Sequence, residues 1–333
     1  MPGRITDVDG ILVGNAHDLV GLTGCTVVFG TESFPAGMDR RGMATSTRQV
    51  DSLQEPLHTV SEIDAFLISG GSAFGHNAGS GVMRWLEEHD RGMPTLYGRI
   101  PICPSAAIFD LGLGDSKVRP DADMGYQACE NLGVEFDVGS VGAGAGATVG
   151  KVYTAKNAMK GGLGTASRIR DDLVVGALSV VNAFGDVVDP QSGRIIAGAR
   201  KNPNDLTLVD TVSVLLGGKL NRHVNAPDQP YLEPGPENTT ICVVATNAHL
   251  DRLNVQRLAR MVQTAMPHVI QPVHTPVDGD VVFTVATGKV DASLNQVATL
   301  AVDAVVESIL NAVLTADGFN RIPSAQDLLK AGS

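Results

Sequence analysis

The first candidate for a reactive residue is a threonine, Thr239, at a point where the sequence changes abruptly from proline-rich to apolar. Residues 221–238 (NRHVNAPDQPYLEPGPEN) contain four prolines and can neither pair as a central strand nor continue a helix. Residues 239–246 (TTICVVAT) are β-branched or small and apolar, which predicts a strand buried on both faces. Threonine often starts a strand, so by itself this pattern makes Thr239 an ordinary sheet residue.

The alternative is that the bond between Asn238 and Thr239 is cut, so that Thr239 becomes a chain terminus. An α-amine has a pKa of about 8, well below that of lysine, and is substantially neutral near pH 7. It is joined through its own Cα to the carbon that bears the hydroxyl, so it can act as the base for that hydroxyl without a histidine. Thr240 is the competing nucleophile, but the residue after the scissile bond must carry the hydroxyl.

Two aspartates, Asp278 and Asp280, flank a glycine just before the apolar run VVFTVAT. Residues two apart in an extended segment project to the same side, so the two carboxylates would face one another and share a proton. A solvated D-G-D turn is the simpler interpretation of this segment alone. His268 and His274 lie nearby, but their spacing matches no zinc or calcium pattern, so no metal is expected.

The run from Gly142 to Ala147 fits G-x-G-x-x-A, the loosest form of a dinucleotide fingerprint. The acidic residue expected about 20 positions later is missing, and Lys160 and Arg168 occupy that region. A P-loop is excluded, because the residue after Lys151 is neither serine nor threonine. A structural loop that delivers Lys151 to a reaction centre is the preferred interpretation, and no cofactor is expected.

Asn182 ends a predicted strand over 173–181, where its side-chain amide could donate a hydrogen bond to a developing oxyanion. A plain turn asparagine would look the same in the sequence. A serine hydrolase with the G-x-S-x-G motif is excluded, since Ser72, Ser80 and Ser140 each lack at least one flanking glycine.

The remaining elements must position these side chains. Apolar segments predict further strands, and periodic segments predict helices. The strands are expected at 11–13, 25–29, 65–68 and 281–287, and the helices at 77–89, 122–132, 251–266 (with Asp251 as N-cap) and 292–316. The C-terminal third alternates strand and helix with strands apolar on both faces, which predicts an α/β or layered α+β architecture.

Composition sets limits on the partners. Of the 333 residues, 43 % are hydrophobic and 18 % are charged, which is typical of a soluble globular protein, and the net charge of −11 argues against nucleic acid or an anionic membrane as partner. Four scattered cysteines form no C-x-x-C pair and predict free thiols. The first residues show no secretory signal, and no uninterrupted apolar run reaches about 18 residues. A cytoplasmic location is therefore expected.

Read in order, the motifs NTTI, VVATNAHL and HTPVDGDVVF resemble the DmpA-type aminopeptidase family, peptidase family S58, with its D-aminopeptidase, β-aminopeptidase and nylon-oligomer hydrolase members. The likeness extends over most of the chain, through ITDVDGILVG, LISGGSAFG, IFDLG, KGGLGTAS and VVNAFGDVVDP. It implies an Ntn-hydrolase-like α+β fold, a four-layer αββα sandwich. It also implies one domain over 1–333 that cleaves itself into 1–238 and 239–333 and assembles as an oligomer, often a tetramer.

The resemblance also implies roles for individual residues. The family nucleophile falls on Thr239, and the carboxylate pair falls on Asp278 and Asp280. The active-site lysine of the nylon-oligomer branch falls on Lys151, and the oxyanion-hole asparagine falls on Asn182. The implied reaction is hydrolysis of amide bonds in small peptides or ω-amino-acid oligomers through an ester on Thr239.

One position departs from the family pattern. Relatives place a tyrosine near the oxyanion in the segment that here reads AAIFD, where this chain has Phe109. A phenyl ring cannot donate a hydrogen bond, so the oxyanion would depend more on Asn182 and on backbone N–H groups. Two other interpretations stay open: a nucleotide-binding protein that uses the loop from Gly142 to Ala147, and a relative that never cleaves and serves as an assembly or binding protein.

Overall fold

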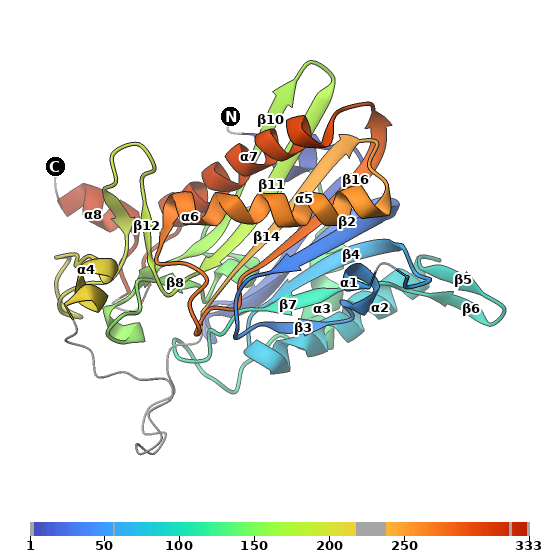
Figure 1. The fold of residues 1–333 in the computed structure, drawn as a ribbon. Coiled ribbons are helices and arrows are strands. Elements are labelled where there is room, and N and C mark those ends of the chain that lie inside the picture. Colours follow the sequence, from blue (N-terminus) through green and yellow to red (C-terminus); the bar gives the residue numbers. More distant parts are fainter. Residues whose placement is uncertain (1–2, 56, 218–237, 320–321, 332–333) are drawn as a thin grey trace, which may run out of the picture.

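The computed structural model describes residues 3–55, 57–217, 238–319 and 322–331, and its centre is a nine-stranded sheet (Figure 1). The strand order is β10-β11-β14-β16-β2-β4-β7-β3, and β1 pairs with β2. The bounds are β1 (Ile11–Asp18), β2 (Thr23–Arg40), β3 (Ser46–Arg48), β4 (Glu62–Ser69), β7 (Ser105–Ala107), β10 (Gly162–Arg170), β11 (Leu173–Asn182), β14 (Thr239–Ala248) and β16 (Val281–Val290). Of the proline-rich connector predicted at 221–238, all but Asn238 lies outside the described residues.

The long strand β2 divides this sheet into two halves. Its first part pairs with β1 and β4, and its last part, from Ala36 to Arg40, pairs with β16. Between these parts the register with β4 shifts, from Phe29 to Phe34, as expected where a strand bends. One half therefore holds β10, β11, β14 and β16, and the other holds β1, β4, β7 and β3.

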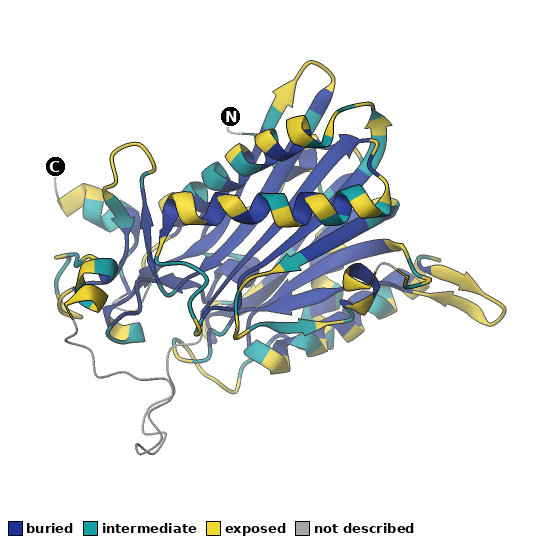
Figure 2. Cartoon of the chain, in the orientation of Figure 1, coloured by how far each residue is buried: buried dark blue, intermediate teal, exposed yellow. Residues whose placement is uncertain are grey.

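Three apolar clusters separate four layers. One lies between the β14 half and the helices α5 (Arg252–Val262) and α7 (Leu294–Leu314), and another lies between the β4 half and the helices α2 (Ala78–Glu88) and α3 (Ala122–Glu130). The third fills the space between the two halves, where the rings of Phe66 and Phe283 stack with centroids 4.7 Å apart. Figure 2 shows the buried strands beneath helices whose outer faces are exposed. The expected αββα arrangement is confirmed.

The helix predicted from Asp251 to Met266 is shorter than expected. Asp251 caps it as predicted, because its Oδ1 accepts the N–H of Asn254 over 2.8 Å. The α-helix ends at Val262, and a 3₁₀ turn leads into the short helix α6 (Met266–Val269). Pro267 explains the break, because its ring has no N–H and clashes with the carbonyl four residues before it.

Helix α7 is the core helix of the fold. By length and composition it could cross a membrane, because its most apolar 18-residue stretch has a mean hydropathy of 1.8. Half of that stretch, however, is buried inside the fold. Ser293 caps its first turn, because the Ser293 hydroxyl accepts the N–H of Gln296. The helix packs on β10 and β11 through buried residues such as Val305 and Ile309. Burial against a sheet accounts for its apolar composition.

The strand ends that carry the predicted site meet at one edge of the β14 half. Strands β14 and β16 are parallel, with Ile241 opposite Val281, and α5 lies in the crossover between them. Parallel strands joined in this way begin at the same edge. Strand β11 runs antiparallel to β14 and ends there, with Asn182 directly opposite Thr239. Strand β2 also ends there, with Arg40 opposite Val281.

Smaller elements surround this frame. They are α1 (Asp51–Gln54), β5 (Met93–Thr95), β6 (Gly98–Ile100), β8 (Thr148–Val149), β9 (Met159–Lys160), β12 (Asp186–Val188), β13 (Ile195–Ala197), α4 (Thr211–Leu216), β15 (Ile270–Gln271) and α8 (Ala325–Ala331), with 3₁₀ turns at Ile5–Asp7, Ser72–Asn77, Gly142–Gly144, Ala155–Asn157 and Gln263–Ala265. The four cysteines are buried free thiols, as predicted.

Candidate active site

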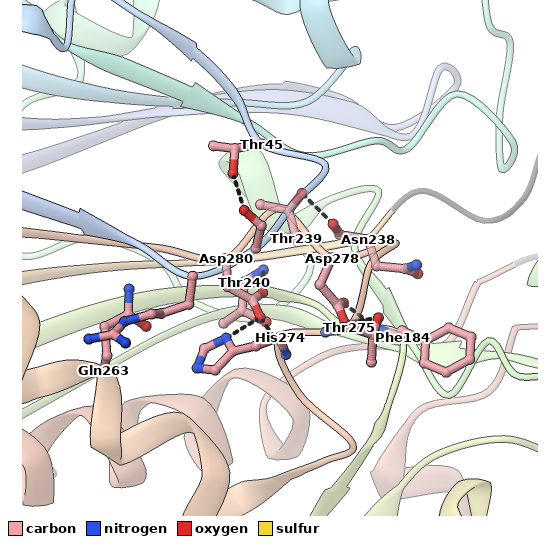
Figure 3. A network of polar contacts seen from close by, with 12 residues as sticks. Thr45, Phe184, Asn238, Thr239, Thr240, Gln263, His274, Thr275, Asp278 and Asp280 are labelled. Atoms are coloured by element: carbon pink, nitrogen blue, oxygen red, sulfur yellow. Dashed lines mark hydrogen bonds and ion pairs between the residues drawn. The ribbon is translucent and has the colours of Figure 1, made fainter. Parts of the chain in front are cut away.

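The bond between Asn238 and Thr239 lies buried at the shared edge of β14 and β16 (Figure 3). The Thr239 side chain points back along the chain, and its Oγ1 donates to the carbonyl oxygen of Asn238 over 2.6 Å. The same oxygen accepts the backbone N–H of Gly279 over 2.7 Å, in an isolated parallel bridge between Asn238 and Asp278 just before β14 and β16 begin. A hydroxyl and a backbone donor therefore converge on one peptide carbonyl.

The Asp280 carboxylate fixes the start of β14. Its Oδ1 accepts the N–H of Thr240 over 2.7 Å. Its Oδ2 accepts two bonds from His274, from the backbone N–H over 3.1 Å and from ring Nδ1 over 2.8 Å. Asp280 thus holds the residue next to Thr239 in place.

Asp278 accepts bonds from a different set of donors. Its Oδ2 accepts the N–H of Thr275 over 3.0 Å and the hydroxyl of Thr275 over 2.5 Å, and its Oδ1 accepts the N–H of Phe184 over 3.2 Å. Burial, together with the charge of Asp280, raises the pKa of Asp278 to about 6, although the hydrogen bonds from Thr275 and Phe184 act in the opposite direction. This carboxyl can hold or release a proton close to neutral pH.

Lys151 reaches the site from the end of the Gly/Ala loop. It follows Gly150, which has a φ of +74° and whose Cβ, if present, would lie 2.0 Å from the backbone nitrogen of Ala199, so only glycine fits there. Its Nζ donates to Asn182 O over 3.0 Å and to Asn182 Oδ1 over 2.7 Å. Burial lowers the pKa of Lys151 to about 7, although the negative charges of Asp278 and Asp110 oppose the change.

Asn182 links Lys151 to strand β14. It is fully buried at the end of β11, and its Oδ1 also accepts the N–H of Thr148 over 3.0 Å. One N–H of its side-chain amide goes to the carbonyl oxygen of Phe109 over 3.1 Å. An amide carries two such N–H groups, so one remains for an oxyanion. The backbone of Phe109, rather than its ring, makes this contact.

The Gly/Ala loop does not have the exposure that a phosphate-binding loop needs. Every residue from Gly142 to Ala147 is buried, and the side chain of Lys160 donates to the carbonyl oxygens of Gly144 and Ala145. Its role is structural, as the sequence indicated. His268 is exposed, and the residues covered by the structure contain no cluster of three or more His, Cys, Asp or Glu side chains suited to a metal ion.

Sequence reasoning missed the partners of the aspartates. Gly279, His274 and Thr275 contact the Asn238 carbonyl or the two carboxylates. The sequence predicts no role for Gly279 or Thr275, and it suggests His274 only as a metal ligand. Their common location in the motif HTPVDGD was the available signal. The buried charges of Asp110 and Lys160 left no such signal, because they lie far from the motif in the sequence.

The chain is similar to known proteins over most of its length. The family model of peptidase family S58 matches residues 3–323. An uncharacterised aminopeptidase of Mycobacterium tuberculosis (strain H37Rv) is 38 % identical over 348 residues, which cover 97 % of each chain. A 6-aminohexanoate-oligomer endohydrolase of Paenarthrobacter ureafaciens is 30 % identical over 289 residues, which cover 86 % of this chain and 75 % of the relative.

Solved structures show the same fold. The L-aminopeptidase D-Ala-esterase/amidase of Ochrobactrum anthropi, described as a variant of the Ntn hydrolase fold, superimposes with a TM-score of 0.72 at 19 % identity. The match covers 99 % of this chain and 94 % of that one. The family match over nearly the whole chain and the 38 % identical relative establish that the protein belongs to peptidase family S58 and is a hydrolase of peptide or amide bonds.

Proposed function

We propose that the protein is a self-processing N-terminal-nucleophile amidohydrolase, in which Thr239 first cleaves its own chain and then attacks substrates. The observation that supports this most directly is the convergence on Asn238. The hydroxyl of Thr239 lies 2.6 Å from the carbonyl oxygen of the bond to be cut, and Gly279 donates its N–H to that oxygen over 2.7 Å. Such a donor stabilises the negative charge that develops when the carbonyl is attacked.

Self-cleavage follows in two steps. Thr239 Oγ1 attacks the carbonyl carbon of Asn238, the C–N bond breaks, and the hydroxyl proton ends on the departing nitrogen. The resulting ester joins Asn238 to Thr239 Oγ1, and water hydrolyses it to the carboxylic acid of Asn238 and the free hydroxyl. Thr239 is left with an α-amine.

Turnover then uses that amine as a base for the neighbouring hydroxyl, directly or through water. The substrate acyl group forms an ester with Thr239, the substrate amine leaves with the proton, and water releases the acid. The remaining N–H of Asn182 stabilises the oxyanion. Lys151 and the pair Asp278 and Asp280 hold the threonine and adjust its protonation, which the contact of Lys151 with Asn182 and the contact of Asp280 with the Thr240 N–H support.

The products of the cut would remain one folded unit. Residues 1–238 supply β11 and residues 239–333 supply β14 and β16, and these strands are neighbours in a single sheet. We propose a single domain cut within itself, with the two fragments associated as a heterodimer. The heterodimers assemble as a tetramer in this proposal, for which the hairpin of β5 and β6 provides a candidate contact. At its tip, Leu96 and Tyr97 are 96 % and 98 % exposed.

Denaturing electrophoresis and intact mass analysis test the cleavage. Dividing 34.7 kDa in proportion to 238 and 95 of 333 residues gives fragments of about 25 and about 10 kDa. The smaller fragment should begin at Thr239 by N-terminal sequencing. An active preparation that contains only the 34.7 kDa chain would rule the proposal out. Light scattering of the native protein should give about 139 kDa, four times 34.7 kDa, for the tetramer.

The substrate class is proposed from the names of relatives. Aminopeptidases and a 6-aminohexanoate-oligomer endohydrolase both match this chain over most of its length. We propose small peptides and ω-amino-acid oligomers as substrates. A panel of aminoacyl anilides with small L-, D- and β-residues, together with 6-aminohexanoate oligomers, separates exo-acting from endo-acting hydrolysis. Lack of turnover across the panel by fully cleaved protein would contradict the substrate assignment.

A further inference from the structure

Two buried charged residues, Asp110 and Lys160, have no part in the reaction described above. Their side chains are 4 % and 1 % exposed. Lys160 Nζ donates to the carbonyl oxygens of Ala145 over 2.7 Å and Gly144 over 3.4 Å, and Asp110 Oδ1 accepts the N–H of Gly71 over 2.7 Å. Burying a charge costs free energy, so two such groups near an active site call for a physical reason.

Lys160 is connected to the active-site lysine through two short strands. In the pairing of β8 with β9, Lys160 lies directly opposite Thr148. The N–H of Thr148 donates to Asn182 Oδ1 over 3.0 Å, and Lys151 Nζ donates to the same oxygen over 2.7 Å. A displacement of Lys160 or its strand therefore acts on the oxygen that orients Lys151.

Asp110 lies near Lys151 and Asn182 but comes from another part of the chain, the segment that follows β7. Its side chain rests on the Gly/Ala loop, since a Cβ on Gly146 would lie 2.5 Å from Asp110 Cβ and 2.6 Å from Asp110 Oδ2. The preceding residue, Phe109, accepts the side-chain N–H of Asn182. Lys160 thus contacts the loop at residues 144 and 145, and Asp110 contacts it at the next residue.

The charges around Lys151 come from three elements. Asp278 lies before β16, Asp110 follows β7, and Lys160 belongs to β9. The two carboxylates favour the protonated form of Lys151, and the positive charge of Lys160 disfavours it, while burial has the largest effect. The negative charges of Asp110 and of the exposed Asp317 in turn raise the pKa of Lys160.

Burial also shifts the pKa values of Asp110 and Lys160 themselves toward neutral pH. It lowers the pKa of Lys160 to about 8, against the negative charges of Asp110 and Asp317. It raises the pKa of Asp110 to about 6, while the Gly71 N–H and the charge of Lys160 act in the opposite direction.

We propose that Asp110 and Lys160 are a pair of positioning residues that sets the charge of Lys151 through opposing electrostatic effects. This inference rests on the proposed role of Lys151 in the reaction. Neither residue touches the reacting atoms. Loss of the Asp110 carboxylate should make Lys151 easier to deprotonate, and loss of the Lys160 ammonium should make Lys151 harder to deprotonate.

Titration of Lys151 by nuclear magnetic resonance tests the pair without using activity. The full chain carrying Thr239→Ala, labelled with ¹³C-lysine, provides one covalent state, and Lys151→Met assigns the resonance. Asp110→Asn should lower the midpoint of Lys151 and Lys160→Gln should raise it, each by about one pH unit. Glutamine keeps a donor for the Ala145 carbonyl. The same change at an exposed lysine, Lys156→Gln, should leave the midpoint in place.

A double variant guards against simple misfolding. Asp110→Asn combined with Lys160→Gln removes one charge of each sign, so the midpoint of Lys151 should return toward that of the parent. A structural disturbance would not cancel in this way. Midpoints that stay unchanged in both single variants, or that move in the same direction, would overturn the proposal.

Activity then separates this inference from the proposed function. In the cleaved enzyme, the limb of the kcat/KM against pH profile that belongs to Lys151 should move down with Asp110→Asn and up with Lys160→Gln. If the midpoints of Lys151 move while this limb stays fixed, Asp110 and Lys160 do set the charge of Lys151, but Lys151 has no role in hydrolysis. If the midpoint of Lys151 stays fixed in the variants and self-cleavage is normal, the inference about Asp110 and Lys160 is wrong, while Thr239 remains the nucleophile.

Discussion

The backbone N–H of Gly279 donates to the carbonyl oxygen of Asn238 over 2.7 Å. The contact belongs to an isolated parallel bridge just before β14 and β16, so the main chain itself places a donor where negative charge would develop during self-cleavage. The side-chain hydroxyl of Thr239 lies on the same oxygen.

Gly279→Ala should slow self-cleavage by at least about 100-fold, because a displaced nucleophile loses the alignment that intramolecular attack requires. A Cβ on Gly279 would lie 2.7 Å from Thr239 Oγ1 and 2.8 Å from the carbonyl oxygen of Ala44. The rate of fragment appearance after refolding gives the measurement. Gly112→Ala is the matched control, since nothing lies within 4 Å of its Cβ position. Equal rates for both variants would refute this role of Gly279.

Thr239→Ala should leave the chain at 34.7 kDa and abolish hydrolysis, because no hydroxyl remains next to the scissile carbonyl. Thr240→Val is the control for the competing nucleophile. Among the described residues, the buried Oγ1 of Thr240 has no hydrogen-bond partner, so a methyl group of similar shape can replace it at little cost. This variant should cleave normally on a denaturing gel. The reverse pattern would assign the nucleophile to Thr240.

Asn182→Ala should lower kcat by about 10²–10³ with a smaller change in KM, the size of effect found when one oxyanion donor is lost. Alanine also removes the Oδ1 that accepts from Lys151 and Thr148. Asn182→Asp keeps that oxygen and replaces the N–H donors by a second carboxylate oxygen that cannot donate, so it should lose at least a similar factor. Steady-state kinetics of pre-cleaved enzyme provide the comparison. Near-normal kcat for the aspartate variant would argue against an oxyanion role.

Lys151 should make stability depend on pH. Its pKa falls from the ordinary 10.5 to about 7 in the folded chain, so between these values the unfolded chain binds one more proton and stability rises with pH. Lys151→Met removes this contribution. The free energy of unfolding of the parent, measured relative to this variant, should rise by up to about 1.4 kcal/mol for each pH unit above 7.

Urea denaturation of both proteins between pH 6 and 9.5 provides the measurement, with Thr239→Ala in each to keep one chain. The hydrogen bonds that Lys151 makes to Asn182 add a constant offset, which leaves the slope unaffected. A difference that does not vary with pH would show that Lys151 keeps an ordinary pKa in the folded state.

Local sequence patterns determined much of the frame. The sequence predicts apolar strands that begin at Leu173, Thr239 and Val281, and the structure has them at those residues. A strand buried on both faces needs an unbroken run of apolar side chains, which can be recognised in the sequence. The cap at Asp251 was also predicted. The break at Val262 was missed, since the pattern was continued past the helix end that precedes Pro267.

The candidate site depended on tertiary structure to a greater extent. The sequence by itself determined that Thr239 starts a strand after a break and that two aspartates precede another, and its resemblance to a family gave Lys151 and Asn182 their expected roles. Only the parallel pairing of β14 with β16 brought Gly279 to Asn238. Only the folded loop brought Asp110 and Lys160 near Lys151. Sheet register and packing decide such contacts between distant residues, and side-chain periodicity along the chain carries no information about them.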